Sequence, residues 1–441
     1  MRGGAIGSGV GRVVLVAVLA VLTAGTVVAA RGRSAPATVG VATVVRPPLA
    51  FVRAGTSLVT VDVERREVAL TAEGAVSSLD GAELFRTRDA GAGAELEALD
   101  PRTGDVRWRR PVARGLVPRV ASYDGSRVAL MAPAAAATGG YPEGRATTDL
   151  VVAGPEGRPQ RHHLRGNLEP EAFGLDGRHL YLIEYVPATA PSGYKVRRLD
   201  LATGRVGPVD SPDIAPDTVM GGSARAQVMA PDGARLYTLY SVPAGVPDGL
   251  HGTDHERGRA FVHVLDLEEG WAHCLLLPDP IGVHSRASGP LAVSPDGRTL
   301  AVVDTEPQTG RSSYLAVDTE RLDPGPLRPV GARWATAAAI DADRSLYVSG
   351  TGRVGRPRVE VLDLADGTRR RRWETPTLVS SLSAEPDGSL LLAEPERERV
   401  VVMRPGGSGG RSLPLPGGGA VAVGPASVTL PGPRDVLECA C

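Results

Sequence analysis

One short pattern recurs along the chain from Leu49 onward: an apolar strand, an Asp-Gly turn, a second apolar strand, a loop and a third apolar strand. Seven copies align on their opening turns, which are Asp80-Gly81, Asp124-Gly125, Asp176-Gly177, Asp232-Gly233, Asp296-Gly297, the departing Asp341-Ala342-Asp343, and Asp387-Gly388. A two-residue hairpin turn requires a positive φ, which glycine adopts freely and aspartate tolerates. The pattern therefore predicts a series of β-hairpins made from one repeated unit.

The third strand of the unit is also recognisable, because four copies end it with a Leu-Asp pair and close the next turn with glycine. They are LEALDPRTG at 96–104, VRRLDLATG at 196–204, VHVLDLEEG at 262–270 and VEVLDLADG at 359–367. The opening turns lie roughly 45 to 64 residues apart, which is typical of a four-stranded propeller blade with variable loops. No segment after residue 49 keeps the 3.6-residue apolar period of a helix. We therefore predict an all-β fold, a β-propeller.

The two ends of the repeat region complement each other. Residues 49–74 match the second, third and fourth strands of a blade, and residues 418–425 match a first strand. Pairing the two segments closes the ring and removes the exposed edges that an open array of sheets carries. Seven complete copies and this shared blade predict eight blades. Seven blades are the alternative, because 90–93 and 134–140 could hide a miscount.

The composition agrees with this architecture. The chain has 55 glycines and 37 prolines among 441 residues, and only 4% of its residues are aromatic. Such a balance favours many turns and small side chains over long helices. The chain is also longer than a single hydrophobic core usually supports, which favours growth by repetition.

Three of the repeats resemble known families. Residues 98–108 read ALDPRTGDVRW and resemble the tryptophan-docking repeat of pyrroloquinoline-quinone-type propellers, A-x-D-x-x-T-G-x-x-x-W. The segments SPDGRTLAVVD at 294–304 and APDGARLYTLY at 230–240 resemble YVTN and WD40-type repeats. The docking pattern is complete once, since Trp373 lies one residue later in register than Trp108 and the copies at 196–204 and 262–270 lack the tryptophan.

The resemblance implies a bacterial extracytoplasmic β-propeller, and such propellers include quinoprotein dehydrogenases, lactonases and non-catalytic scaffolds. A quinoprotein would further imply adjacent cysteines at the cofactor, with asparagine and acidic ligands for calcium. This chain has no adjacent cysteines and a single asparagine, Asn167. We therefore predict no organic cofactor and keep a divalent metal as the one alternative.

The N-terminal segment sets the expected compartment. Arginines flank an uncharged apolar run, VVLVAVLAVLTAGTVVAA, at residues 13–30. A run of this length suits either a signal peptide cleaved near Ala30 or a helix that anchors the chain in a membrane. Both alternatives place the body outside the cytoplasm, because the short basic N-terminus is expected to stay inside. We predict a signal peptide or hydrophobic anchor helix at 1–30, a linker at 31–48, the propeller at 49–433 and a tail at 434–441.

The chain has three cysteines, Cys274, Cys439 and Cys441, without the spacing of a zinc site. Outside the cytoplasm, a disulfide could join Cys274 to one of the two C-terminal cysteines. The alternative, which we favour, is a buried Cys274 and a C-terminal tail without fixed structure.

Histidine and acidic residues gather once, in the loop 248–257. His251, Asp254 and His255 could present two imidazoles and a carboxylate to a divalent metal. The alternative is a solvated loop, because inserted loops are usually polar.

For three further motifs we predict a structural role and no ligand or chemistry. We expect His162-His163 and the arginines at 369–372 to lie on outer strands in contact with solvent. His273 and Cys274 are adjacent on a strand and so point to opposite faces, which argues against a nucleophilic pair.

The formal net charge of −1 provides no overall field for binding nucleic acid. The parallel α/β scaffold that a serine hydrolase needs is not expected in this chain, and neither a P-loop nor H-E-x-x-H occurs. We therefore predict a non-catalytic extracytoplasmic propeller that binds or scaffolds a protein or glycan of the cell envelope. The alternative is an exported hydrolase or lactonase with a metal at the central channel.

Overall fold

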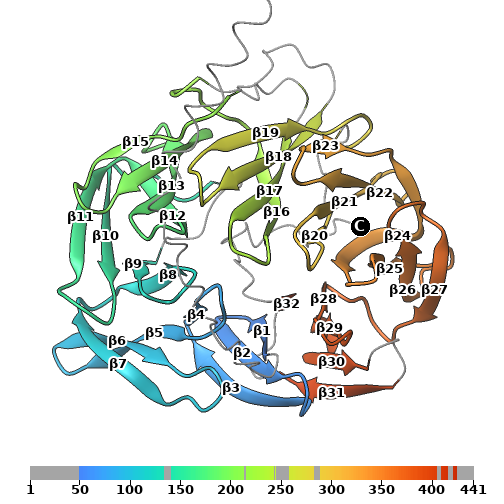
Figure 1. Ribbon diagram of the computed structural model, residues 1–441, viewed down its shortest axis with the longest axis horizontal. Coiled ribbons are helices and arrows are strands. Elements are labelled where there is room, and N and C mark those ends of the chain that lie inside the picture. The colour runs from blue at the N-terminus through green and yellow to red at the C-terminus, as the bar shows by residue number, and fades with distance from the viewer. Residues whose placement is uncertain are drawn as a thin grey trace, which may run out of the picture. The chain divides into compact units, whose positions relative to one another are not determined.

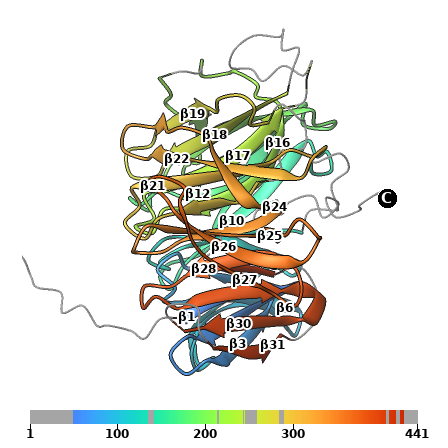
Figure 2. The same cartoon turned by 90° about the vertical axis from the view of Figure 1, so that its right-hand side faces the viewer.

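The computed structural model describes residues 49–133, 141–212, 215–242, 244, 258–282, 289–404, 409–415 and 421–424. All of them belong to the unit Pro47–Cys441. Within this unit, antiparallel sheets follow one another around a ring (Figure 1). Viewed from the side, neighbouring sheets are packed against each other along the ring (Figure 2). The all-β propeller predicted from the repeat is therefore confirmed.

Three four-stranded sheets contain the N-terminal strands. Blade 1 consists of β1 (Leu49–Ala54), β2 (Ser57–Asp62), β3 (Glu67–Glu73) and β32 (Val421–Gly424). Blade 2 consists of β4 (Val76–Ser77), β5 (Leu84–Ala90), β6 (Gly93–Leu99) and β7 (Val106–Val112). Blade 3 consists of β8 (Val117–Ala121), β9 (Val128–Met131), β10 (Thr147–Ala153) and β11 (Gln160–Arg165).

Three further four-stranded sheets follow the same plan. Blade 4 consists of β12 (Asn167–Phe173), β13 (His179–Val186), β14 (Gly193–Asp200) and β15 (Val206–Pro208). Blade 5 consists of β16 (Ser223–Met229), β17 (Arg235–Val242), β18 (Arg259–Asp266) and β19 (Ala272–Leu276). Blade 6 consists of β28 (Ser381–Ala384), β29 (Leu390–Glu394), β30 (Arg399–Met403) and β31 (Gly410–Pro414), with a 3₁₀ turn, η1 (Pro395–Arg397), before β30.

Between blades 5 and 6 lies one eight-stranded sheet, which we call the double sheet. Its strands are β20 (Leu291–Val293), β21 (Thr299–Thr305), β22 (Arg311–Asp318), β23 (Asp323–Pro324), β24 (Arg328–Ile340), β25 (Ser345–Thr351), β26 (Pro357–Asp363) and β27 (Arg369–Glu374). The first part of β24 pairs with β22 and its last part pairs with β25. The fourth strand of one repeat thus continues into the first strand of the next.

This continuity corrects the blade count. The described chain forms six four-stranded blades, and the expected eight blades and the alternative of seven are both wrong. The strands that follow the turns at Asp296-Gly297 and Asp341-Ala342-Asp343 belong to the double sheet and do not form separate blades. The sequence of β24 contains no Asp-Gly turn. One continuous strand therefore pairs with β22 over its first part and with β25 over its last part.

The two ends of the propeller pair as predicted. In blade 1, β32 pairs antiparallel with β1, and Val423 lies opposite Val52. This pairing supplies β1 with a partner on its inner side, where the sheet would otherwise have an open edge. The observed order of the blade is β3-β2-β1-β32.

The Asp-Gly turns have the predicted geometry. The six glycines of these turns have φ between 62° and 79°. The aspartate side chain accepts the N–H two residues later, as between Asp124 Oδ1 and Ser126 N (3.0 Å). In the departing copy Arg344 occupies the left-handed position instead, with φ 57°.

The hydrophobic core is divided among the spaces between neighbouring sheets. Phe85 and Leu96 of blade 2 pack with Leu130 of blade 3, and Val52 of blade 1 packs with Leu391 of blade 6. Middle strands such as β17 and β21 are therefore buried on both faces. In the docking-type segment, Trp108 lies opposite Ala98, with its ring centroid 5.8 Å from that of Phe85.

Several predicted features lie outside the described residues. They are the hydrophobic segment 13–30, the linker 31–48 and the C-terminal tail 434–441. Among the residues that are described, no helix has the length and apolar character needed to cross a membrane. The signal peptide or anchor helix and the location outside the cytoplasm remain predictions.

Candidate functional site

Three successive inner strands, β8, β12 and β16, carry the same irregularity. Their pairing with the next strand skips one residue, which is Arg119 in β8, Glu171 in β12 and Arg225 in β16. An extra residue of this kind forms a β-bulge, which re-aims one side chain and is frequent beside functional sites. The extra residue is charged in all three strands. The bulges thus place ionisable groups on the inner strands of blades 3, 4 and 5 (Figure 1).

The local sequence accounts for two of these bulges. Pro118 precedes Arg119 and Pro170 precedes Glu171. Proline has no N–H to donate to a ladder, so within sheets it occurs at edge strands and bulges. Both β8 and β12 are edge strands of their sheets. In β16 the residue before Arg225 is Ala224, and every residue of the strand is partly exposed, which indicates that β16 borders an open space.

Glu169, also on β12, links blades 3 and 4. Its Oε2 lies 3.5 Å from Arg119 Nη2, and its Oε1 lies 3.6 Å from Arg145 Nη2. Arg145 also donates to the carbonyl oxygen of Leu168 at 2.6 Å. The carboxylate is 6% exposed, so the two guanidinium groups compensate a buried negative charge.

Glu171 has no such cation among the described contacts. Gln227 Nε2 on β16 donates to Glu171 Oε1 (3.1 Å) and to Thr238 Oγ1 (2.9 Å). Glu171 Oε2 is buried and has no hydrogen-bond partner within the described part of the chain. Burial raises the pKa of this carboxyl group to about 7, and the hydrogen bond from Gln227 opposes the rise.

An aromatic layer packs behind these groups. Tyr240 stacks on Tyr194, with ring centroids 4.7 Å apart, and on Phe261 at 5.3 Å. Tyr185 meets Tyr141 edge to face at 6.2 Å. Burial raises the pKa of Tyr185 and Tyr240, and the nearby Glu171 raises both further. These hydroxyls therefore stay protonated and can donate hydrogen bonds at neutral pH.

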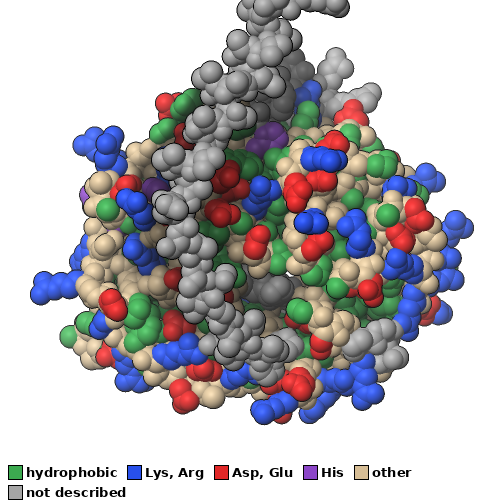
Figure 3. All heavy atoms as spheres, viewed as in Figure 1, with side chains coloured by type: hydrophobic (Ala, Val, Ile, Leu, Met, Phe, Trp, Pro, Cys, Tyr) green, Lys and Arg blue, Asp and Glu red, His purple; other side chains and the backbone are tan. Residues whose placement is uncertain are grey.

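The polar residues that these three blades bring together form one candidate site, which we call the hub site. It consists of Arg119, Arg145, Glu169, Glu171, Arg225 and Gln227. Figure 3 shows acidic and basic side chains next to one another on one face of the ring, in the area between β12 and β16. The hub site can offer guanidinium donors, a carboxylate acceptor and a carboxyl group that titrates near neutrality.

The sequence-based metal site is not tested by this structure. His251, Asp254 and His255 all lie outside the described residues. Within the described ranges, no three His, Cys, Asp or Glu side chains are grouped in a way that could hold a metal ion. Metal binding by the loop 248–257 remains a prediction.

The structural roles predicted for His162-His163 and for Cys274 agree in part with the structure. His162 and His163 lie on the outer strand β11, as expected, and His163 Nδ1 is 2.7 Å from Asp149 Oδ1. His162 is buried, contrary to the expected solvent contact, and burial lowers the pKa of its imidazole. Cys274 is buried, with Sγ 4.0 Å from Met220 Sδ, while Cys439 and Cys441 lie outside the described residues.

The arginines at 369–372 lie on the outer strand β27, as predicted. Arg369 Nη1 lies 3.6 Å from Glu360 Oε1, and Arg370 Nη2 lies 2.6 Å from Asp363 Oδ2. The guanidinium carbon of Arg371 lies 5.6 Å from the centroid of the Trp373 ring. These contacts divide the run among separate partners. They favour the structural interpretation over a site for an anionic polymer.

Glu171 makes the stability of the fold depend on pH. Its pKa is about 7 in the folded chain and 4.5 when exposed, so the folded state holds the proton more tightly. The stabilisation is complete below about pH 4.5 and is lost as the pH rises through about 7. We expect the Glu171→Gln variant, which cannot titrate, to gain roughly 1–3 kcal/mol relative to the wild type between pH 4.5 and pH 8.

Urea unfolding at a series of pH values measures this gain. Glu385 has a raised pKa of about 7 as well, so Glu385→Gln is the matched control for a second buried carboxyl group outside the hub site. Parallel stability profiles of the wild type and Glu171→Gln would contradict the assignment of a raised pKa to Glu171.

Comparison with known proteins extends the fold assignment only. No family model matches the sequence, and no curated protein matches it significantly. Among solved structures, AztD from Citrobacter koseri is similar with a TM-score of 0.51 and 11% identity, covering 85% of this chain and 97% of AztD. The dihydro-heme d1 dehydrogenase NirN is similar with a TM-score of 0.50 and 14% identity, covering 86% of this chain and 75% of NirN. At these identities the likeness shows that the chain is a β-propeller and nothing finer.

Proposed function

We propose that this chain is a non-catalytic binding propeller of the cell envelope that holds an acidic glycan at the hub site. The observation that carries the proposal is the set of three consecutive β-bulges, each of which aims a charged residue from an inner strand. Bulges re-aim side chains and are frequent beside functional sites, so a charged bulge residue on the inner strand of three adjacent blades favours contact with a ligand.

The charge balance of the hub site favours an anionic ligand. Arg119 and Arg145 pair with the carboxylate of Glu169, and the bulge of β16 adds a third guanidinium group, that of Arg225, whose Nε donates to Ser241 Oγ (2.5 Å). Guanidinium groups bind carboxylates through paired, charge-assisted hydrogen bonds. Glu169 and Gln227 add planar groups that accept hydrogen bonds from hydroxyls. A glycan that contains uronic-acid units would match both features.

Trp334 supplies an aromatic surface on the same face of the ring. Its amide donates to the carbonyl oxygen of Gly310, in the connection between the second and third strands of a repeat. Arg145 lies in the equivalent connection of blade 3, and these connections share one face because every repeat runs through its strands in the same order.

The conformation of Trp334 also indicates a ligand contact. The residue is 48% exposed and has a φ of 52° inside β24. A tryptophan in the left-handed region is strained by about 1–3 kcal/mol, and such strain is concentrated at ligand contacts. An exposed indole can stack on the apolar face of a sugar ring.

The location outside the cytoplasm is part of the proposal and is supported by the apolar segment 13–30. A protein partner is the runner-up, since a propeller face suits either class of ligand. The hydrolase or lactonase alternative depends on a metal held at the central channel by side chains from several blades, and it remains a prediction.

Binding of the purified protein to immobilised polysaccharides tests the proposal. The panel contains uronate-bearing glycans and the same glycans with their carboxylates reduced to alcohols. We expect binding to an acidic glycan that weakens at high salt. We expect Arg119→Gln to weaken it roughly tenfold or more, because a charge-assisted hydrogen bond is lost. Trp334→Ala should weaken it without changing its dependence on salt.

Arg165→Gln on the outer strand β11 is the matched control, since it removes the same charge from an outer strand and not from the hub site. Equal binding of the acidic and the reduced glycans, or full binding by Arg119→Gln, would rule out the hub site as the glycan site. Binding of an envelope protein that Arg119→Gln abolishes, with no glycan bound, would favour the runner-up.

A further inference from the structure

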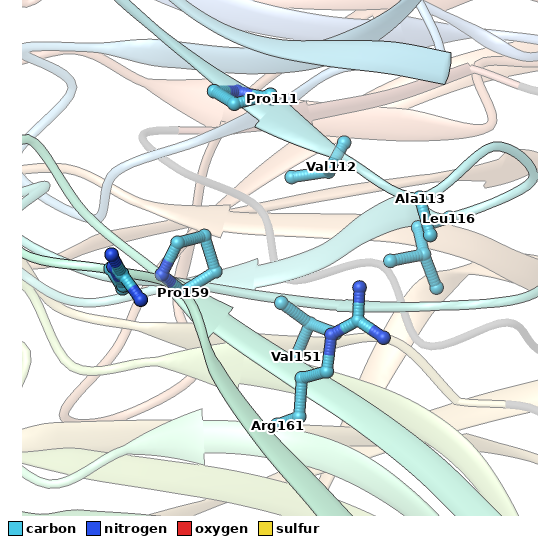
Figure 4. Close-up of a pocket in the computed structure, with 8 residues that line it drawn as sticks. Pro111, Val112, Ala113, Leu116, Val151, Pro159 and Arg161 are labelled. Carbon is cyan, nitrogen blue, oxygen red and sulfur yellow. The ribbon is translucent and has the colours of Figure 1, made fainter. Parts of the chain in front are cut away.

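A pocket opens on the outer side of the ring, at the seam between blades 2 and 3. It has a volume of about 350 Å³, which lies in the range of small-molecule pockets. The end of β7, the segment before β8, and the strands β10 and β11 with their connection supply its walls. Figure 4 shows side chains from these segments facing one another across the seam.

The walls of the pocket are mostly apolar. Pro111, Val112, Ala113 and Leu116 lie on one side, and Val151 and Pro159 lie on the other. Val151 belongs to the core between the two blades, and Val112 and Leu116 pack against that core. The pocket is thus an opening into the hydrophobic layer between two sheets, so an alkyl chain would find apolar side chains on both sides.

Two guanidinium groups line the same pocket. They belong to Arg158 and Arg161, and Figure 4 shows the Arg161 side chain reaching past Val151 towards Leu116. Neither arginine has an ion pair or a side-chain hydrogen bond within the described part of the chain. The acidic residue closest in sequence, Glu156, is exposed and makes no ion pair with either of them.

Three arginines of blade 2 near the pocket, in contrast, have partners. Arg109 lies 3.2 Å from Glu97, and Arg114 lies 3.6 Å from Asp89. Arg110 donates to the carbonyl oxygens of Gly154 and Pro155 and so ties blade 2 to blade 3 beside the pocket. Arg158 and Arg161 differ from these three arginines because both line the apolar opening.

We propose that this pocket binds a single-chain amphipathic carboxylate, such as a medium-chain fatty-acid anion. The alkyl chain occupies the space between Val112, Leu116 and Val151, and the carboxylate pairs with Arg158 and Arg161. Guanidinium groups favour carboxylates because the planar fork matches both oxygens. The site is separate from the hub site, so the proposal does not rest on the proposed function.

Calorimetry with monomeric decanoate and the full chain tests the proposal. Decanol and decyltrimethylammonium have the same chain and lack the anionic head. We expect decanoate to bind at least tenfold more tightly than either, because only its head pairs with the two guanidinium groups. We expect the Arg158→Ala/Arg161→Ala double variant to lose this preference. Ala113→Trp, which fills the opening from an exposed position, should abolish binding.

Arg165→Ala is the matched control, because Arg165 lies on the same strand as Arg161 and does not line the pocket. It should bind decanoate like the wild type. Equal affinity for decanol, or unchanged decanoate binding by Ala113→Trp, would overturn the proposal. Binding to anionic phospholipid vesicles that Arg165→Ala weakens as much as the double variant would also overturn it, since the surface charge and not the pocket would then be responsible.

Discussion

Replacing Glu97 by alanine is expected to destabilise the propeller by about 3–4 kcal/mol. Glu97 lies on the buried strand β6, is 1% exposed and faces three arginines. Its Oε2 accepts from Arg86 Nε (3.0 Å) and Nη2 (2.9 Å), and its Oε1 lies 3.4 Å from Arg88 Nη2 and 3.2 Å from Arg109 Nε. Without the carboxylate, three positive charges remain close together, and the nearby Glu95, 3.9 Å from Arg88, compensates only part of that charge.

The three arginines are partly exposed, so water can hydrate them after the substitution. This places the expected loss at the lower end of the range for breaking a buried ion pair. The free energy of unfolding in urea measures it. Glu97→Gln keeps the size of the side chain and should lose most of the same stability.

Glu95→Ala is the matched control, because Glu95 lies on the same strand and pairs with Arg88 at 3.9 Å from a partly exposed position. A surface pair of this kind contributes about 0.5 kcal/mol. A Glu97→Gln variant as stable as the wild type would show that the cluster contributes no net stability.

Ending the chain after Leu415 is expected to cost about 4 kcal/mol or more and to promote self-association. The truncation removes β32, so that Phe51, Val52, Arg53 and Ala54 of β1 lose their backbone partners. Each lost backbone hydrogen bond costs about 0.5–1.5 kcal/mol, and a buried group left without a partner costs more. The open edge of β1 then offers a template for pairing with a second copy.

Urea unfolding and light scattering measure the two effects. A chain that ends after Gly424 is the matched control, since it lacks the residues after 424 but keeps β32. The control should retain the stability of the full chain. Equal stability of both truncations would show that the pairing of β1 with β32 does not close the ring.

Much of the fold could be predicted because its determinants are local. The turns Asp124-Gly125 and Asp296-Gly297 need one glycine with positive φ, and that requirement is visible in any single copy of the repeat. The pairing of the two ends could be predicted for a related reason, because each end is an incomplete copy. The double sheet could not, because nothing in RPVGARWATAAAI shows that the fourth strand of one repeat continues into the first strand of the next.

The hub site was missed for a different reason. Its residues are spread over blades 3, 4 and 5, and none belongs to a motif with fixed spacing. One signal was present: Pro118-Arg119 and Pro170-Glu171 each place a charged residue five positions before the aspartate of an opening turn. A proline beside a charge inside an apolar strand indicates a bulge. The raised pKa of Glu171 could not be predicted, because it depends on burial by a neighbouring blade.

The continuous strand β24 gives the ring one stiff sector. Sheets that meet only through side chains can slide or tilt slightly against each other, whereas backbone hydrogen bonds hold β22, β24 and β25 in a fixed alignment. Trp334 lies at this join. A force applied to its indole is therefore shared by two repeats, and the elasticity of the ring must reside in the seams elsewhere.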